Sequence, residues 1–118
     1  MKSGSKASTT EGRVTPEGLE KLAGVFRVFG EAGRLALLQE LKEGEKTVGE
    51  LVELSGIGQA GVSKHLKMMH DADILSRRKE GTKVYYAVSD PMVFELCDLV
   101  CSKLVREQEQ LRAIEYVI

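Results

Sequence analysis

Residues 47–69, TVGELVELSGIGQAGVSKHLKMM, restrict the fold of this chain more than any other stretch. Thr47 and Glu50 have the spacing of a capping box, in which a hydroxyl and a carboxylate satisfy free N–H groups at the start of a helix. The glycines of the SGIG segment that follows favour a turn, because glycine loses backbone entropy in a helix. A second helix is predicted from Gln59. Two helices joined by a tight glycine-containing turn form a helix-turn-helix pattern.

The second predicted helix has one apolar face and one polar face. Val62, Leu66 and Met69 recur at i, i+4 and i+7, which is the spacing of a side that faces a core. The opposite face carries four polar side chains: Gln59, Ser63, Lys64 and Lys67. In this motif the exposed early part of the second helix enters the DNA major groove.

The residue types on this polar face suit contacts to DNA. Glutamine can pair with adenine through two hydrogen bonds, and serine can contact either partner of a base pair. We therefore predict that Gln59 and Ser63 read bases, and that Lys64 and Lys67 contact phosphates, which position the protein without reading sequence. A solvated helix face is the alternative. His65 lies one step off this face, where it either flanks the core or donates to a phosphate.

A β-hairpin is predicted after the second helix, with strands over residues 74–79 and 82–88 and a turn at Glu80-Gly81. Basic side chains cluster towards its tip: Arg77, Arg78, Lys79 and Lys83. Residues 59–83 hold six Lys and Arg against three Asp and Glu, a local charge of +3 in a chain of net charge −1. Local phosphate contact requires such a basic patch. We predict that these four cations lie along a sugar-phosphate backbone, with a solvated charged face as the alternative.

Four segments together resemble the ArsR/SmtB family of small bacterial and archaeal winged-helix transcription factors. They are VFGEAGRLALLQEL, TVGEL, GIGQAGVSKHLKMMHDADIL and SRRKEGTKVYYAV, in the family's order, within residues 19–104. The resemblance implies a mainly α (α+β) winged helix-turn-helix with about five helices and a two-stranded hairpin wing. It also implies a homodimer joined by the terminal helices, a repressor that binds double-stranded DNA at a pseudo-palindromic operator. The alternative is a winged-helix module for protein–protein assembly that does not bind DNA.

The chain is expected to divide into one domain and two tails. The first residues are polar and have no hydrophobic period, whereas Thr15-Pro16 supplies a helix cap and a proline at the first helical position. The expected parts are a disordered tail (1–14), a winged helix-turn-helix DNA-binding and dimerisation domain (15–112) and a C-terminal tail (113–118). Within the domain, a helix over residues 34–42 is predicted to turn Leu35, Leu38 and Leu41 inward.

The last helix is predicted from Asp90-Pro91 to about Arg112. An apolar seam follows the 3-4-3-4-3 spacing of helix packing; its members are Phe94, Cys97, Cys101, Leu104, Gln108 and Leu111. Val93, Leu96 and Val100 give the helix a second apolar side. We expect one side to pack on its own domain and the other, with the first helix, on a partner subunit.

Cys97 and Cys101 lie four residues apart and share one face of this helix. That spacing can hold a thiophilic metal or metalloid, and a dimer would supply four thiolates. The pair can also respond to oxidation or reactive sulfur across the interface. The second interpretation is core filler, because a free cysteine is often a small buried hydrophobe. No other cofactor is expected.

The family's two usual metal sites are absent at the matching positions. One uses Glu-Leu-Cys-x-Cys, but residues 50–54 here are ELVEL, with valine and leucine in place of both cysteines. The other uses Asp-x-His on the last helix with two further ligands downstream. Here Asp90 is followed by Met92, and the downstream positions are Lys103 and Arg106, whose cationic side chains cannot serve as ligands. Zinc, nickel or cobalt sensing by these routes is not expected.

Length and composition exclude several other classes of protein. A chain of 118 residues with 42% apolar and 30% charged residues is of a size and balance suited to one domain. It has neither an apolar run that can span a bilayer nor the apolar segment of a signal peptide, so we expect a cytoplasmic protein with reduced thiols and no membrane contact. An enzyme is not expected either, because glycine-rich phosphate loops and nucleophile–base pairs are missing.

Overall fold

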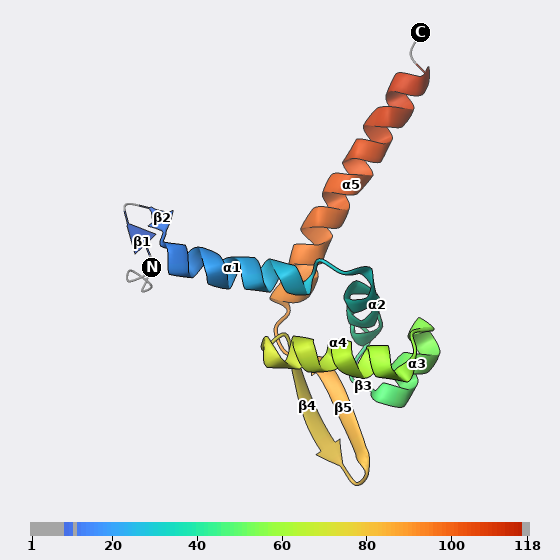
Figure 1. The fold of residues 1–118 in the computed structure, drawn as a ribbon. Coiled ribbons are helices and arrows are strands. Elements are labelled where there is room, and N and C mark those ends of the chain that lie inside the picture. The colour runs from blue at the N-terminus through green and yellow to red at the C-terminus, as the bar shows by residue number, and fades with distance from the viewer. Residues whose placement is uncertain (1–8, 11, 117–118) are drawn as a thin grey trace.

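The computed structural model describes residues 9–10 and 12–116. A winged helix-turn-helix body carries two projecting helices (Figure 1). In chain order the elements are β1 (Thr9–Thr10), β2 (Arg13–Val14), α1 (Pro16–Val28), α2 (Ala32–Leu41), β3 (Lys46–Thr47), α3 (Val48–Ser55), α4 (Gln59–Asp71), β4 (Leu75–Glu80), β5 (Lys83–Val88) and α5 (Met92–Tyr116). The five helices of this described part agree with the predicted fold class.

The core lies where α2, α3, α4, the wing and the start of α5 meet. Val62, Leu66 and Met69 of α4 are completely buried, as their spacing predicts. They pack with buried apolar side chains from the other elements: Leu37, Leu38, Leu41, Leu51, Ile74, Leu75, Tyr86 and Val93. Each fully buried aliphatic side chain contributes roughly 1.5–3 kcal/mol relative to exposure. The apolar face of α4 therefore fixes the helix with its polar face towards solvent.

The helix-turn-helix has the predicted caps. The Thr47 N–H donates to Glu50 Oε1 at 2.8 Å, and the Glu50 N–H donates to Thr47 Oγ1 at 3.2 Å. Gly56 ends α3 at φ 75°, a left-handed conformation that favours glycine. A Cβ at Gly61 would lie only 3.0 Å from Ile57 Cγ2, so glycine lets the turn pack closely on α4. The angle between α3 and α4 is thus set by local packing.

The wing is an antiparallel sheet with strand order β3-β5-β4. β4 and β5 confirm the two predicted strands, but Glu80 pairs with Lys83, so the turn is Gly81-Thr82 and not the predicted Glu80-Gly81; Gly81 has a φ of 64°. β3 adds a third strand beside the predicted two-stranded hairpin. β3 pairs Lys46 with Tyr86 and Thr47 with Tyr85, and two residues are too few to show an alternating pattern in the sequence.

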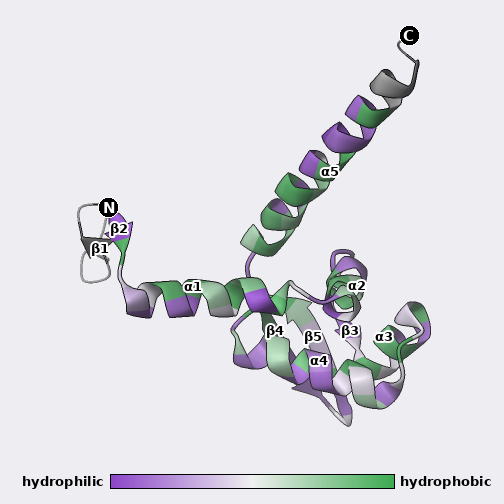
Figure 2. Cartoon of the chain, turned by 45° about the horizontal axis from the view of Figure 1, so that its top comes forward, coloured by the Kyte–Doolittle hydropathy of each residue, from purple (hydrophilic) through white to green (hydrophobic). Residues whose placement is uncertain are grey.

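Helices α1 and α5 extend away from the body (Figure 1). The radius of gyration is 18.2 Å, whereas a compact chain of this length has about 13 Å. Hydrophobic residues lie along both helices (Figure 2). The large exposed ones are Leu19, Leu22, Val25 and Phe26 on α1, and Met92, Leu99, Val100, Leu104, Val105 and Leu111 on α5. An exposed apolar surface of this kind is typical of an interaction site.

Three helix predictions differ in part from the structure. Leu35 of α2 is 39% exposed, and Leu37 takes the buried position beside Leu38 instead. α5 packs on its own domain only in its first turns, through Val93 and Phe94. From Asp98 to Leu111 every side chain is exposed, because the helix then leaves the body. α5 also continues to Tyr116, past the expected end near Arg112.

The structure describes only part of the N-terminal segment. Residues 1–8 and 11 of the predicted disordered tail lie outside the described residues. The described part forms a short hairpin, in which Thr9 pairs with Val14 and Thr10 with Arg13. Gly12, at φ 80°, supplies the left-handed turn. The three-part division of the chain stays a prediction.

Candidate nucleic-acid interface

All four predicted DNA-contacting residues of α4 are exposed: Gln59, Ser63, Lys64 and Lys67. The two lysines differ in whether their charge is already paired within the chain. Lys67 Nζ lies 2.9 Å from Asp71 Oδ2, one helical turn further on. The hydrogen bond from Lys67 lowers the pKa of Asp71. Lys64, in contrast, forms no ion pair with the part of the chain that the structure describes.

His65 faces inward rather than towards a phosphate. Its side chain is only 15% exposed, and Nε2 lies 3.5 Å from Glu31 Oε1, just before α2. The ring rests against Gly33, where a Cβ would lie 2.9 Å from Nε2. Of the two roles that the sequence leaves open, the structure therefore supports the flank of the core.

The four predicted wing cations lie on two faces of the β4–β5 hairpin. Directly opposed residues of an antiparallel pair point to the same side, and successive residues alternate. Arg77 pairs with the buried Tyr86, so Arg77 and Lys79 continue the face that carries the core residues. Arg78 and Lys83 lie on the other face. What the sequence predicts as one cluster is divided by the register into two pairs.

Arg78 is held by carboxylates of its own chain. Its Nη2 lies 2.6 Å from Glu45 Oε2 and its Nε donates to Glu45 Oε1 at 2.9 Å, while Nη1 contacts Glu80. Its guanidinium carbon also lies 4.6 Å from the centre of the Tyr85 ring. The hydrogen bonds to Glu45 and Glu80 raise the pKa of Arg78, and the bond from Arg78 lowers the pKa of Glu45. We call these four residues the Arg78 clamp.

The cations of the candidate interface fall into two groups, those with an ion pair inside the chain and those without one. Lys67 and Arg78 are neutralised within the chain. The other predicted cations form no ion pair within residues 9–10 and 12–116: Lys64, Arg77, Lys79 and Lys83. Sequence reasoning missed Glu45, because a partner 33 residues away from Arg78 leaves no local signal. Sequence reasoning also missed Tyr85, because the predicted turn at Glu80-Gly81 places Lys83 opposite Arg78, whereas the observed register places Tyr85 there.

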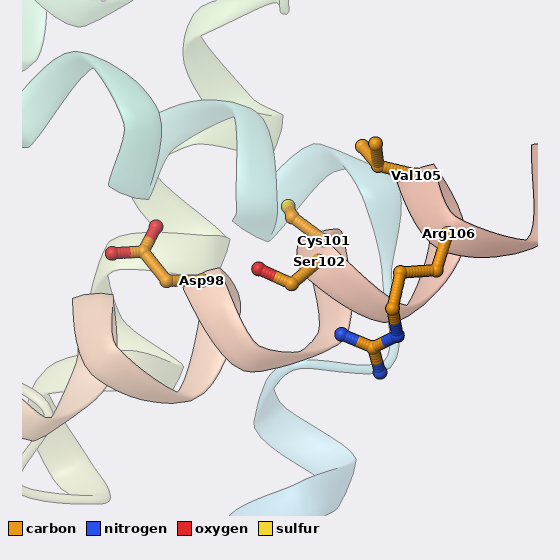
Figure 3. Close-up of a pocket in the computed structure, with 5 residues that line it drawn as sticks. All are labelled: Asp98, Cys101, Ser102, Val105 and Arg106. Carbon is orange, nitrogen blue, oxygen red and sulfur yellow. The ribbon is translucent and has the colours of Figure 1, made fainter. Parts of the chain in front are cut away.

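The two cysteines lie on α5 where it leaves the body. Cys97 is partly buried and Cys101 is exposed, and both are free thiols. Burial, with Cys101 and Asp98 nearby, raises the pKa of the Cys97 thiol. Cys101 lines an open hollow with Asp98, Ser102, Val105 and Arg106, all from α5 (Figure 3). Among the described residues no three metal-ligating side chains gather at one place, so a site with more than two thiol ligands needs a second chain.

Comparison with known proteins identifies the family. The family described as "Bacterial regulatory protein, arsR family" matches residues 31–77. An uncharacterized HTH-type transcriptional regulator of Methanocaldococcus jannaschii is 36% identical over 85 residues, which cover 71% of this chain and 96% of that protein. The chain belongs to the ArsR family. This confirms the resemblance to ArsR/SmtB regulators.

Two further relatives bear on function and assembly. A probable mercury resistance operon repressor of Streptomyces lividans is 44% identical over 71 residues, which are 60% of this chain and 57% of that ArsR-type relative. The chain thus spans little more than half the length of that repressor. The solution structure of a homodimeric winged helix-turn-helix DNA-binding domain from Mycobacterium bovis, a possible ArsR-family regulator, has a TM-score of 0.63 and 26% identity. That similarity covers 85% of this chain and 84% of the other, and it confirms the winged helix-turn-helix fold.

The relatives from Streptomyces lividans and Methanocaldococcus jannaschii are a probable operon repressor and an HTH-type transcriptional regulator, and transcriptional regulation is the class of function that the sequence predicts. Within the described residues, none of the helices has the length and hydropathy needed to span a bilayer.

Proposed function

We propose that this chain is a homodimeric repressor that binds a pseudo-palindromic operator in double-stranded DNA in the cytoplasm. The observation that carries the proposal is the exposed polar face of α4, held by a fully buried apolar face, in a member of the ArsR family. Gln59 and Ser63 read base edges in the major groove. Lys64 contacts phosphates beside them, and Arg77, Lys79 and Lys83 do so from the wing.

The homodimer is supported by the shape and hydropathy of the chain. α1 and α5 project from the body and expose large apolar side chains that a second copy would cover. The similar domain from Mycobacterium bovis is itself a homodimer. Two-fold symmetry would present two α4 helices to successive turns of the major groove, so the operator would be pseudo-palindromic.

Salt dependence of DNA affinity tests the phosphate contacts. The probe is a fluorescein-labelled duplex selected by the wild-type protein from a random-sequence library, and anisotropy gives the Kd over a series of KCl concentrations. Loss of Lys64 removes one contact per subunit, so Lys64→Ala should reduce the slope of log K against log salt by about 1.8 per dimer. Lys42→Ala, at the end of α2, is the matched control and should leave the slope unchanged, because Lys42 is also exposed and has no ion pair among the described residues.

The same assay addresses base reading and the competing function. Gln59→Ala should relax the preference at one position of the selected site, because one bidentate pair to a base is lost. Equal losses on all single-base variants of the site would remove Gln59 from the base-reading set. If the wild-type protein binds no duplex at moderate salt, DNA binding is refuted and the protein–protein assembly module becomes the better hypothesis.

We further propose that Cys97 and Cys101 bind a soft metal ion or metalloid that releases the DNA. Both thiols lie on α5, which exposes the apolar side chains that a partner subunit would cover in the proposed dimer, and thiolates prefer soft ions. Burial raises the pKa of the Cys97 thiol, which favours its protonated form. Binding must then displace the thiol proton, so the apparent metal affinity should increase with pH.

Titration with Hg²⁺ or arsenite tests the thiol site. Ultraviolet absorption reports thiolate–metal bonds, and anisotropy reports release of the selected duplex from the same sample. The wild-type protein should bind the ion and lose the DNA, whereas Cys97→Ser and Cys101→Ser should each keep the DNA. If wild-type DNA binding is indifferent to both ions and to oxidation, the two cysteines only fill space at the helix interface.

A further inference from the structure

Glu31 occupies the capping position before α2, yet its side chain makes no capping hydrogen bond. Its two carboxylate oxygens are used by two different partners instead. Oε2 lies 3.2 Å from Arg34 Nη1, and Oε1 lies 3.5 Å from His65 Nε2. A residue at a helix cap normally accepts a hydrogen bond from the first turn. This carboxylate therefore serves contacts between elements in place of a cap.

The first partner connects Glu31 to the end of α1. Arg34 is buried, and its remaining donors reach the last turn of that helix. Nε donates to the Val28 carbonyl at 2.7 Å, and Nη2 donates to the Arg27 carbonyl at 3.0 Å. A cation suits these carbonyls, because the C-terminus of a helix carries partial negative charge. Arg34 thereby fixes the direction in which α1 leaves the body.

The second partner connects Glu31 to the helix that carries the DNA-reading face. His65 lies in the middle of α4, and its ring reaches Glu31 only because Gly33 has no side chain. The imidazole forms an ion pair with the carboxylate whenever it is protonated. The exposed Glu31 carboxylate thus connects α1, through Arg34, to α4, through His65. α1 carries part of the proposed dimer surface, and α4 carries the proposed recognition surface.

We propose that Glu31 is a positioning residue that sets the orientation of α4 relative to α1, and so the spacing of the two operator half-sites that the dimer accepts. This inference rests on the proposed function. In a two-fold dimer the distance between the two α4 helices depends on how each α4 is held against its dimerising helices. One added base pair moves a half-site by about 3.4 Å and rotates it by about 35°. If the contacts of Glu31 hold α4 rigidly against α1 on this scale, the dimer selects one half-site spacing. If these contacts are loosened, the dimer accepts several spacings.

Three substitutions separate the parts of this argument. Glu31→Gln keeps the side-chain length and can still bridge both partners. Glu31→Asp keeps the charge and is a good helix cap, but it is one methylene shorter and cannot reach both partners at once. Glu31→Ala removes the bridge. If Glu31 only supports the start of α2, Glu31→Asp should behave most like the wild type. If Glu31 positions α4, Glu31→Gln should behave most like the wild type.

The experiment measures the dependence of affinity on half-site spacing. Labelled duplexes carry two copies of the half-site selected by the wild-type protein, with the centre-to-centre spacing changed one base pair at a time, and one duplex carries a single half-site. For the wild type and Glu31→Gln, a change of one base pair should weaken binding about tenfold. For Glu31→Asp and Glu31→Ala, the loss should fall to about threefold or less, with single half-site affinity and sedimentation unchanged.

The outcomes distinguish this inference from the proposed function. If Glu31→Asp and Glu31→Ala keep the wild-type spacing preference while melting cooperatively, Glu31 does not position α4 and the inference is overturned. If the wild type binds well at every spacing, the inference is also overturned, although DNA binding stands. If the wild type binds neither duplex type, the proposed function fails and takes the inference with it. His65→Ala should reproduce the Asp phenotype, since it removes the other end of the same contact.

Discussion

The Arg78 clamp limits how strongly the wing attracts DNA, and Glu45→Gln should therefore strengthen DNA binding at low salt. In the wild type, Glu45 and Glu80 hold the Arg78 guanidinium. Glutamine keeps the size of residue 45 and removes one of the two charges that neutralise Arg78. The Nε and Nη2 donors that Glu45 binds can then meet a phosphate, while Nη1 stays paired with Glu80.

The size of the effect follows from counterion release. Each additional phosphate contact steepens log K against log salt by about 0.9, and a dimer gains two contacts, so the slope should increase by about 1.8. Between 50 and 200 mM salt, a fourfold change, this adds a loss of affinity of about 12-fold. Anisotropy of a labelled duplex over that range of KCl measures the slope directly.

Glu43→Gln is the matched control, because it removes the same charge two residues away and Glu43 has no ion pair to Arg78 among the described residues. Its slope should stay near that of the wild type. Equal changes in both variants would refute the clamp argument, since only general charge would matter. A slope that decreases in Glu45→Gln would show that the clamp holds the wing in its DNA-binding position.

Three further predictions concern stability. Leu66→Ala removes a fully buried side chain of α4 and should cost about 2–5 kcal/mol in guanidinium unfolding. Thr47→Ala should cost about 1 kcal/mol, because α3 loses its cap. The hydrogen bond from the Thr47 backbone lowers the pKa of Glu50. The stability from the Glu50 carboxylate is therefore present above the unfolded pKa of Glu50 and is lost as pH falls through the lower folded value, so in urea melts at decreasing pH the stability difference between the wild type and Glu50→Gln should shrink. Asp73 has φ 61°; Asp73→Val should cost about 1–2 kcal/mol, while Asp73→Asn should stay within about 0.5 kcal/mol in the same melts.

Local patterns predicted the helix-turn-helix and much of the wing, because those elements are determined by residues close together in the chain. The capping box of Thr47 and Glu50 and the buried triplet of α4 are of this kind. The inward turn of His65 was not predictable, because it depends on Gly33 and Glu31, more than 30 positions earlier. Leu35 failed for a related reason, since several leucines of one helix compete for the core and only packing decides among them.

The same limit applies to the candidate DNA interface. Residue types and spacing gave eight polar positions on α4 and the wing, and all eight are exposed. They did not reveal that Lys67 and Arg78 are paired within the chain, because the charge of a residue is visible in the sequence and its partner is not. Nor did they divide the wing cations between two faces, which required the register of β4 against β5.

The length of α5 makes it a lever. Its 25 residues span about 37 Å, and it is anchored only at its base, where Val93 is buried. A tilt of about 5° at that base moves the far end by about 3 Å, close to the diameter of a water molecule. Cys97 and Cys101 lie about one to two helical turns beyond this base. A ligand that shifts the first turns of α5 by a fraction of an ångström therefore moves its distal turns several times as far. Any part of a partner subunit that packs on those turns moves with them.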